Sequence, residues 1–371
     1  MSFKSSTIWN VSYSRSDSYK VVACEDLFDP SNLSLLAFGK KKNSRRFFVI
    51  DSIIRKIYED IILDYFNVHN IDLYLVSFLS GESQKSFSTY NMLLQKVIRF
   101  KLDRRNEPIL SMGGGVLTDV VGFVSSSYRR GVPHLNIPTT LMGYVDAAIG
   151  VKVGINFYNY KNISGAFYPS KQVLLDKRFL LSLSFRHIRN GLGEILKIAI
   201  IKNIFLFRLI EGDLYSILKN KFQCCISMEI INCSIKGLLE ELEVNLFEGN
   251  LTRMVDFGHT FSPLLEMSSD ILHGEAVITD IVCSCILSYN RILLSWFDLS
   301  SILRLLKYLN FRIQYQLMRP DLMWNALQER MIHRSGFQRV PIPYKIGRSI
   351  FVNNINYEEL RKLYNFFYKG C

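Results

Sequence analysis

The sequence lacks any apolar run long enough to span a membrane. Its longest apolar stretches, residues 195–207 and 276–289, are interrupted by Lys197, Lys202 and Asp280. Because a membrane-spanning helix needs about 20 predominantly apolar residues, we expect no membrane anchor. The first residues contain no apolar signal segment, so we expect a cytoplasmic location.

Cysteines and acidic residues are also few. The seven cysteines have no regular spacing and form no Cys-x-x-Cys pair, which argues against a disulfide framework and predicts free thiols. With 45 basic and 33 acidic residues, the formal net charge is +12. The basic residues are dispersed, and the one dense run, 40–42 with Arg45 and Arg46, is predicted to be a solvated loop. We therefore expect no nucleic-acid partner.

The first half of the chain alternates between strand-like and helix-like patterns. Strands are predicted at residues 47–50, 73–78, 108–112, 134–137 and 172–175, and helices at 86–100 and 119–128. Short β-rich runs separated by helical stretches indicate a parallel sheet covered on both faces. Residues 1–183 are therefore predicted to form an α/β domain.

The second half is mostly helical in pattern. Helices are predicted at residues 193–211, 228–243, 275–296 and 298–309, and a small hairpin at 340–346 and 349–352. A chain of 371 residues exceeds the roughly 250–300 residues that one core usually serves. Residues 184–371 are therefore predicted to form a second, helical domain.

A glycine-rich segment follows the third predicted strand and opens a helix. It reads Gly113-Gly-Gly-Val-Leu-Thr-Asp119, so glycines let the backbone approach a pyrophosphate while the helix N-terminus stabilises its charge. It is not the Gly-x-Gly-x-x-Gly fingerprint, and a tight strand–helix turn is an equally open interpretation. Asp51 and the segment from Glu82 to Lys85 also follow strands, where ligands bind in open α/β sheets.

A run of polar residues passes through a second glycine-rich stretch. It comprises Arg129, Arg130, Thr139, Thr140, Asp146, Lys152, Lys161 and Asn162. Lysine, arginine and asparagine on irregular backbone are typical of a phosphate site, because each donates hydrogen bonds to phosphate oxygens. A solvated loop is the alternative, but it would not need the small residues at 143, 150, 154 and 165.

Three residues have the chemistry of an open metal site. His259 and His273 each adjoin a glycine, and Glu194 lies on a predicted helix three residues before Lys197. A surface ion pair is the simpler interpretation of Glu194 and Lys197. However, the residues that follow are almost wholly apolar, which predicts a buried helix. One carboxylate and two imidazoles form the three-ligand set of a catalytic zinc with a free coordination position.

Taken together, these motifs resemble the sugar phosphate cyclases, whose best-known members are the 3-dehydroquinate synthases. The resemblance rests on Gly-Gly-Gly-Val-x-x-Asp at 113–119, Pro-Thr-Thr-Leu at 138–141, Lys-Asn-x-x-Gly-Ala-Phe-Tyr at 161–168 and Gly-His-Thr-Phe at 258–261. It implies a Rossmann-like NAD-binding domain followed by a helical metal-binding domain. It also implies a homodimer.

The resemblance assigns roles to individual residues. It implies that zinc or cobalt is held by Glu194, His259 and His273. Substrate phosphate would be bound by Lys152, Asn162 and an Arg130 reaching across the dimer interface, and substrate hydroxyls by Asp146 and Lys197. NAD would be bound by Asp51, Glu82, Lys85, Gly114, Gly115, Asp119, Thr139, Thr140, Lys161, Phe179 and Ser182.

Departures from the 3-dehydroquinate synthase pattern point to a different substrate. Asp256 replaces an asparagine, Pro263 replaces a histidine, and Leu238 stands where a lysine serves the substrate carboxylate. A carboxylate at position 256 would repel another carboxylate. We therefore expect the substrate to be a phosphorylated sugar without a carboxylate. Asp256 would accept hydrogen bonds from the hydroxyl groups of this sugar.

The pattern resembles the 2-epi-5-epi-valiolone synthases, with His333 as a hydrogen-bond donor or acid/base near the phosphate. These enzymes cyclise sedoheptulose 7-phosphate by transient NAD oxidation, phosphate loss, re-reduction and aldol closure. The desmethyl-4-deoxygadusol synthases, which use the same sugar, and the 3-dehydroquinate synthases are the alternatives. A basic binding protein without activity is disfavoured because the ligand set is complete.

Overall fold

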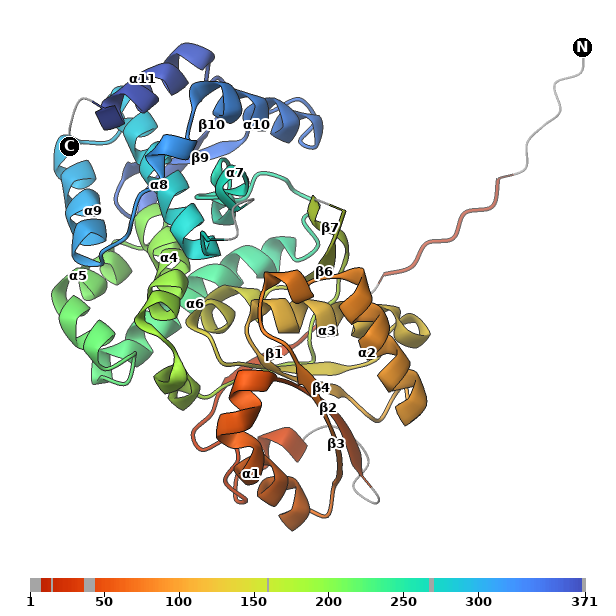
Figure 1. Cartoon of the computed structure of the whole chain (residues 1–371). Coiled ribbons are helices and arrows are strands. Elements are labelled where there is room, and N and C mark those ends of the chain that lie inside the picture. The colour runs from red at the N-terminus through yellow and green to blue at the C-terminus, as the bar shows by residue number, and fades with distance from the viewer. Residues whose placement is uncertain (1–7, 15, 37–43, 159, 267–269, 369–371) are drawn as a thin grey trace, which may run out of the picture.

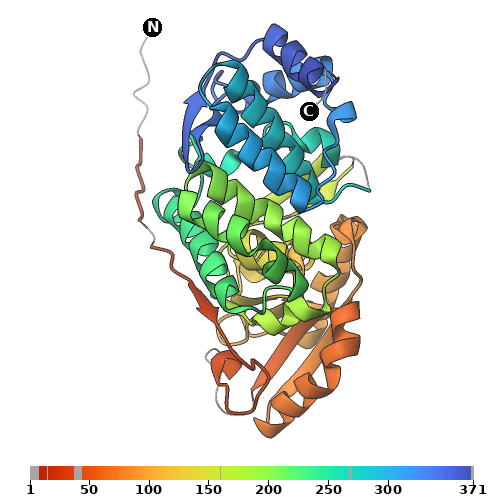
Figure 2. The ribbon, with the colours of Figure 1, turned by 90° about the vertical axis from the view of Figure 1, so that its left-hand side faces the viewer.

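A computed structural model describes residues 8–14, 16–36, 44–158, 160–266 and 270–368 of the chain. The molecule has a sheet-containing half, formed mainly by the first part of the chain, and a helical half stacked upon it (Figure 1). In the second view, helices α4 (Phe185–Ile201), α5 (Ile204–Lys219) and α6 (Cys225–Asn245), coloured green, lie between the sheet and the C-terminal helices (Figure 2). The predicted α/β-then-α organisation is confirmed.

The sheet consists of six parallel strands in the order β1-β8-β5-β4-β2-β3. The strands are β1 (Lys20–Ala23), β2 (Arg45–Asp51), β3 (Asp72–Phe78), β4 (Ile109–Gly113), β5 (His134–Pro138) and β8 (Gln172–Leu175). One face packs on α1 (Ser52–Val68), and the other packs on α2 (Phe87–Phe100) and α3 (Gly115–Ser127). All five predicted strands are present in this sheet, and its sixth strand, β1 at one edge, was not predicted.

The stretch at 150–165, predicted to have irregular backbone, instead forms an antiparallel hairpin of β6 (Lys152–Phe157) and β7 (Tyr160–Phe167). Gly154 pairs with Gly165, and a Cβ on Gly154 would lie 2.7 Å from the carbonyl oxygen of Ser164. The glycines therefore allow the two strands to approach closely. The prediction took their small size as a sign of a phosphate site on irregular backbone, whereas Gly154 and Gly165 serve strand pairing in the structure.

The helical half is built around α8 (His273–Asn290), which is buried along most of its length. The other helices are α7 (Ser262–Glu266), α9 (Trp296–Tyr308), α10 (Pro320–Ile332) and α11 (Tyr357–Tyr368), and the predicted hairpin is present as β9 (Val340–Lys345) and β10 (Arg348–Val352). Its core continues into β8 and the turn around Tyr144. Whether the domain boundary falls at 183/184 stays a prediction, although α4 begins at Phe185.

Two predicted helices were too long. The segment 193–211 is divided between α4 and α5, because the Asn203 side chain accepts a hydrogen bond from the Leu206 amide and starts a new helix. The segment 275–296 ends at Asn290, and Ser295 caps α9 by accepting from the Asp298 amide. Both breaks occur inside apolar sequence, where hydrophobic periodicity gives no stop signal.

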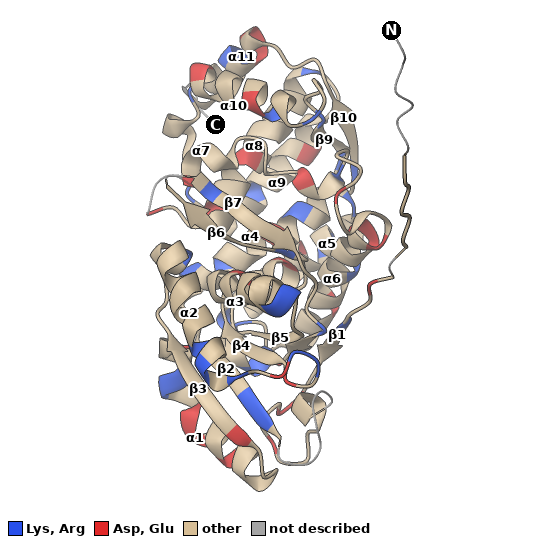
Figure 3. Cartoon of the chain, turned by 90° about the vertical axis from the view of Figure 1, so that its right-hand side faces the viewer, with Lys and Arg blue, Asp and Glu red and all other residues tan. Residues whose placement is uncertain are grey.

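The predicted solvated loop at the basic run was wrong for Arg45 and Arg46. Both lie in β2, a strand paired on both sides, and Arg46 is only 2% exposed. Arg45 forms an ion pair with Glu107 at 2.8 Å. Residues 40–42 lie outside the described residues. Elsewhere the lysine and arginine residues are spread over both halves of the molecule (Figure 3). Among the described helices, none has the length and apolar character needed to cross a bilayer.

Candidate active site

The site begins where α4 crosses α8. A Cβ on Gly193 would lie 3.0 Å from the Gly274 Cα, and one on Gly274 would lie 2.0 Å from the Asn190 carbonyl oxygen. These two glycines let the helix backbones touch. Because Glu194 follows Gly193 and His273 precedes Gly274, the contact brings a carboxylate and an imidazole from distant sequence positions together.

His259 reaches the same place from the turn before α7. The preceding Gly258 has φ +75°, a conformation that favours glycine, and Asp280 of α8 accepts hydrogen bonds from the Phe261 and Ser262 amides at 2.5 and 3.0 Å. Asp280 is buried, and this burial raises its pKa to about 6 against the opposing effect of those amides. The turn carrying His259 is therefore held to the helix that carries His273.

Glu194, His259 and His273 converge with the geometry of a metal site. Their ligand atoms all lie within 4.8 Å of one another. Both Nε2 atoms face Oε1 of Glu194, at 3.7 Å for His259 and 3.3 Å for His273. Both Glu194 oxygens are buried, and neither accepts a hydrogen bond of normal geometry from the described residues. A divalent cation would satisfy these oxygens, so the residues fit the expected zinc or cobalt.

The neighbouring charges keep Glu194 in the ionised form that binds a metal. Lys197 forms a buried ion pair with Glu194. Burial alone would raise the pKa of Glu194, but Lys197 and the two histidines hold it well below its usual value. Burial would lower the pKa of His273, yet the neighbouring carboxylates of Glu194 and Glu266 raise it to about 10. A bound metal would take the place of that proton, because metal binding competes with protonation of its ligands.

Each histidine is oriented through its second ring nitrogen. Nδ1 of His259 lies 3.0 Å from the Phe257 carbonyl oxygen, and Nδ1 of His273 lies 2.9 Å from Oε1 of Glu266. Metal-binding histidines commonly use this arrangement, which fixes the ring and leaves Nε2 for the metal. Glu266, at the end of α7, was missed in the sequence, because one isolated acidic residue carries no spacing signal. Its other oxygen lies 3.8 Å from Nζ of Lys161.

The expected NAD-binding loop forms a close cradle at the start of α3. Gly114 is the N-cap of α3, and no side chain caps the helix. A Cβ on Gly114 would lie 3.2 Å from Cγ2 of Thr140, and one on Gly115 would lie 3.1 Å from Cβ of Ala147. The open amide groups and the absence of side chains fit a pyrophosphate at this helix N-terminus.

Charged residues surround this loop at the carboxyl ends of the strands. Lys85 donates to Asp119 at 2.5 Å, and burial raises the pKa of Asp119 although Lys85 opposes the change. Glu82 accepts from Asn156 of the β6–β7 hairpin at 2.8 Å. Asp51 ends β2 and caps α1, while its other oxygen accepts from Ser80 at 2.6 Å. Asp51, Glu82 and Asp119 therefore lie near the carboxyl ends of the strands, and each forms a hydrogen bond with a nearby side chain.

The remaining residues assigned to NAD are less uniform. Thr139 is buried, and Oγ1 of Thr140 accepts from the Gly143 amide at 3.1 Å. Ser182 donates to the Phe179 carbonyl at 2.8 Å. The Phe179 side chain is 2% exposed and packs between Phe28 and Tyr58 in the core beneath the sheet. The structure therefore does not present this ring to a ligand.

Asp146 lies between the cofactor loop and the metal triad. It is in the π-helical turn η4 (Gly143–Ala147), which contacts both α3 and α4. The Asp146 charge affects both neighbouring sites. Burial is the main cause of the raised pKa of Asp119, and Asp146 adds to it. Burial would lower the pKa of Lys197, but Glu194 and Asp146 raise it.

Lys152, at the start of β6, forms an ion pair with Glu248. Although the Lys152 side chain is 62% exposed, partial desolvation, and then the charge of Arg253, lower its pKa to about 8.

Asp256 differs most from its predicted setting. It is 5% exposed and forms ion pairs with Arg253, Arg330 and Arg334. Burial would raise its pKa, but the three guanidinium groups hold it below its usual value. The carboxylate expected to be free for substrate hydroxyls is therefore already occupied by arginines.

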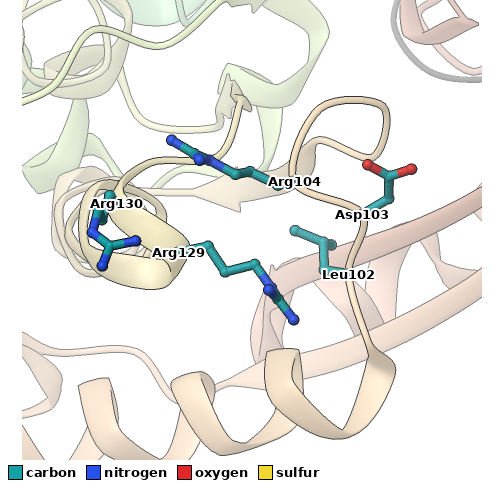
Figure 4. Close-up of a pocket in the computed structure, with 5 residues that line it drawn as sticks. All are labelled: Leu102, Asp103, Arg104, Arg129 and Arg130. Carbon is teal, nitrogen blue, oxygen red and sulfur yellow. The ribbon is translucent and has the colours of Figure 1, made fainter.

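Other predicted residues lie at the surface. Asn162 is exposed with φ +54°, and His333 is exposed at the C-terminal end of α10 beside Arg334. Arg130 is exposed just after α3, which spans 13 residues, so it lies about 20 Å from the glycine loop of its own chain. With Arg104, Arg129, Leu102 and Asp103 it lines a shallow pocket of about 330 Å³ (Figure 4).

Comparison with known proteins agrees with this arrangement. Residues 75–190 match the family described as 3-dehydroquinate synthase N-terminal, and residues 191–333 match 3-dehydroquinate synthase C-terminal. A 2-epi-5-epi-valiolone synthase of Streptomyces hygroscopicus subsp. jinggangensis is 40% identical over 95% of this chain and 87% of its own. A demethyl-4-deoxygadusol synthase of Trichormus variabilis is 32% identical over 92% of this chain and 85% of its own.

A solved structure extends the likeness to three dimensions. A 2-epi-5-epi-valiolone synthase of Streptomyces hygroscopicus subsp. jinggangensis, solved with NAD+ and Zn2+ bound, superposes with a TM-score of 0.93 at 39% identity. The superposition covers 97% of this chain and 99% of that one. The motifs, the fold and these matches along nearly the whole length lead to one conclusion: the chain belongs to the 3-dehydroquinate synthase-like family of sugar phosphate cyclases.

Proposed function

We propose that this protein is a 2-epi-5-epi-valiolone synthase that cyclises sedoheptulose 7-phosphate with loss of phosphate, using NAD and zinc or cobalt. The observation that carries the proposal is a complete metal triad beside an aspartate, Asp256, where 3-dehydroquinate synthases have asparagine. The 40% identity to a 2-epi-5-epi-valiolone synthase supports it.

The bound groups supply the redox and Lewis-acid chemistry. When bound, NAD would supply reversible hydride transfer with one substrate carbon, and the divalent metal would supply Lewis-acid polarisation of the oxygen on that carbon. Glu194, His259 and His273 hold the metal, and the loop at Gly114 and Gly115 holds the cofactor. The metal-binding residue Glu194 is on α4 and the cofactor loop opens α3. Because both helices contact η4, the two sites lie on either side of that turn.

The side chains between these sites orient the sugar. Lys197 stays protonated, since Glu194 and Asp146 raise its pKa, and it donates to substrate hydroxyls. Asp146 accepts hydrogen bonds from them. His333, exposed beside Arg334, is placed to donate a hydrogen bond or transfer a proton near the phosphate.

Lys152 and Asn162 bind the substrate phosphate, together with an Arg130 from a second subunit. Arg130 lies at the far end of α3 from its own cofactor loop, which supports action in the partner's site. We therefore propose a homodimer in which each subunit completes the other's site. The cytoplasmic location stays a prediction.

The direct test is incubation of the NAD- and zinc-loaded protein with sedoheptulose 7-phosphate. We expect release of inorganic phosphate and a product identified by NMR as 2-epi-5-epi-valiolone. An ultraviolet-absorbing product would instead assign the demethyl-4-deoxygadusol synthase reaction. Phosphate release from the carboxylated 3-dehydroquinate synthase substrate, with none from sedoheptulose 7-phosphate, would refute the proposal.

A further inference from the structure

The Asp256 carboxylate is enclosed by three arginines that come from two parts of the chain. Arg253 pairs with Oδ1 and lies just before the turn η6 (Met254–Asp256). Arg330, in the last turn of α10, and Arg334, two residues beyond its end, approach Oδ2 at 3.4 and 2.5 Å. The side chains of all three are only 10–12% exposed. Both carboxylate oxygens are therefore taken up by guanidinium groups, not by solvent.

The arginines are held in place without Asp256. Arg330 also donates to the carbonyl oxygens of His259 and Gln338, at 3.2 and 3.0 Å. Arg334 donates to the Leu251 carbonyl at 2.8 Å, and Arg253 pairs with Glu248. These second contacts would keep the guanidinium groups aimed at the same point after the carboxylate was removed. The cluster is therefore a preformed carboxylate-binding site whose occupant is part of the chain.

The three guanidinium groups have few direct carboxylate partners. Among the described residues, Arg253, Arg330 and Arg334 form ion pairs with only two carboxylates, those of Glu248 and Asp256, and the charge of Asp280 also acts on Arg330. Nε of Arg253 is buried and lacks a hydrogen-bond partner among the described residues. Buried cations without partners are costly, and arginine forks bind planar carboxylates well. If the Asp256 carboxylate were removed, the three guanidinium groups would therefore bind another carboxylate at the same position.

We propose that Asp256 is a built-in carboxylate that occupies the arginine site a carboxylated sugar phosphate would need, and so restricts the protein to carboxylate-free sugars. Its role in specificity is indirect. Asp256 forms ion pairs with the three arginines, so they are not available to a substrate carboxylate, and it does not itself contact a substrate hydroxyl. The identity of the excluded substrate rests on the proposed function, whereas the carboxylate-binding property of the arginines does not.

The first experiment removes the carboxylate and supplies it again from solution. Asp256→Ala lacks a group equal in size to formate, so formate is the probe, with chloride at equal ionic strength as the reference. We expect the thermal midpoint of Asp256→Ala to rise saturably with formate, while wild type responds equally to both salts. Asp321→Ala is the control, because Asp321 is a surface partner of Arg319 at the start of α10.

The proposal can be tested whether or not Asp256→Ala folds in chloride. If the variant does not fold in chloride, formate should restore its refolding yield. Equal effects of formate and chloride on the midpoint, or on that yield, would overturn the idea that these arginines form a carboxylate site. This measurement uses no sugar, so it stands whether or not sedoheptulose 7-phosphate is the substrate.

The second experiment measures selectivity with Asp256→Asn, which keeps the volume and loses the charge. The probes are 6-phosphogluconate and glucitol 6-phosphate, which differ in a carboxylate at one end. We expect the ratio of their dissociation constants to shift at least tenfold toward 6-phosphogluconate in the variant. An unchanged ratio would show that Asp256 does not set discrimination against carboxylates.

Discussion

Nδ1 of His273 lies 2.9 Å from Oε1 of Glu266, while Nε2 of the same ring lies 3.3 Å from Oε1 of Glu194. One ring nitrogen is thus fixed by a carboxylate outside the ligand set, and the other faces the candidate metal position. Glu266 in turn lies near Lys161, a residue assigned to the cofactor. One glutamate therefore connects the candidate metal site with a residue expected to bind NAD.

Replacing Glu266 with glutamine should weaken metal binding. The amide cannot provide the charge that orients the His273 ring, and losses of about 10–100-fold in affinity are typical for such partners. Zinc dissociation constants from chelator competition would measure the effect. Glu358→Gln is the control, since Glu358 is a surface residue paired with Arg361. An unaltered zinc constant in Glu266→Gln would contradict the orienting role.

Gly274→Ala should destabilise the protein and weaken metal binding together. The new Cβ would lie 2.0 Å from the Asn190 carbonyl oxygen, so α4 and α8 must move apart. Overpacking of this kind costs about 1–3 kcal/mol and would separate Glu194 from His273. Denaturant unfolding and zinc titration would measure both effects. Gly212→Ala, where nothing lies within 4 Å of the new Cβ, should leave both unchanged or slightly improve stability.

The pH dependence of kcat/KM should reflect Lys152. Its pKa, lowered to about 8, means that the side chain is charged below pH 8 and loses its proton as the pH rises above that value. Since the charged form would bind phosphate, we expect kcat/KM to fall above pH 8. Lys152→Arg should move that decline to higher pH, because arginine stays protonated. Identical alkaline profiles for the two proteins would exclude Lys152 as the titrating group.

Acid should destabilise the fold through His134. The ring is 1% exposed, stacks on Tyr168, and has its pKa lowered to about 3 by burial and by the charge of Lys171. The unfolded chain binds the proton near pH 6.5, so stability is present above that pH and is lost as the pH falls below it. Between pH 7 and pH 5 the loss is about 2 kcal/mol.

His134→Phe isolates this contribution, because it keeps a ring against Tyr168 and removes the titrating nitrogens. Urea unfolding of both proteins between pH 5 and pH 7.5 would give the difference at each pH. All other ionisable groups are common to the pair, so their effects cancel. The free energy of unfolding of wild type, relative to that of His134→Phe, should decrease as the pH falls. A difference that stays constant with pH would show that His134 is not held neutral by the fold.

Subunit mixing should reveal whether Arg130 acts in the partner's site. Arg130→Ala and Lys152→Ala should each be inactive alone. In a mixed dimer, the Arg130→Ala subunit keeps Lys152 and receives an intact Arg130 from its partner, which restores one site. Random exchange would return about a quarter of wild-type activity. No recovery after exchange, with mixed dimers verified by mass spectrometry, would place Arg130 outside the partner's site.

The fold was largely predictable where pattern and length agree. Apolar β-rich runs predicted five strands of the central sheet, because strands buried on both faces read as continuous hydrophobic segments. Predictions were wrong where local chemistry competed with tertiary contacts. Arg46 was assigned to a loop although β2 buries it, and the division between α4 and α5 depends on a cap at Asn203 that apolar periodicity does not indicate.

The candidate site was predictable in its ligands but not in its surroundings. Histidine and glutamate have chemistry that marks them in any sequence, and the structure brings Glu194, His259 and His273 within reach of one metal. Glu266, Glu248 and Asp280 carry no such mark, because a lone carboxylate is usually a solvated surface group. Their roles follow only from the helix crossing and the turns that place them beside the site.

The sequence by itself determined the family, the candidate metal ligands and the unusual aspartate at position 256. The tertiary structure alone decided what that aspartate does. Arg330 and Arg334 lie 74 and 78 residues beyond Asp256 along the chain, so no local pattern links them to it. Their guanidinium groups meet its carboxylate because the end of α10 packs beside the turn that carries Asp256. Residue type fixes which charges are available, and only the packing of distant segments fixes which of them neutralise one another.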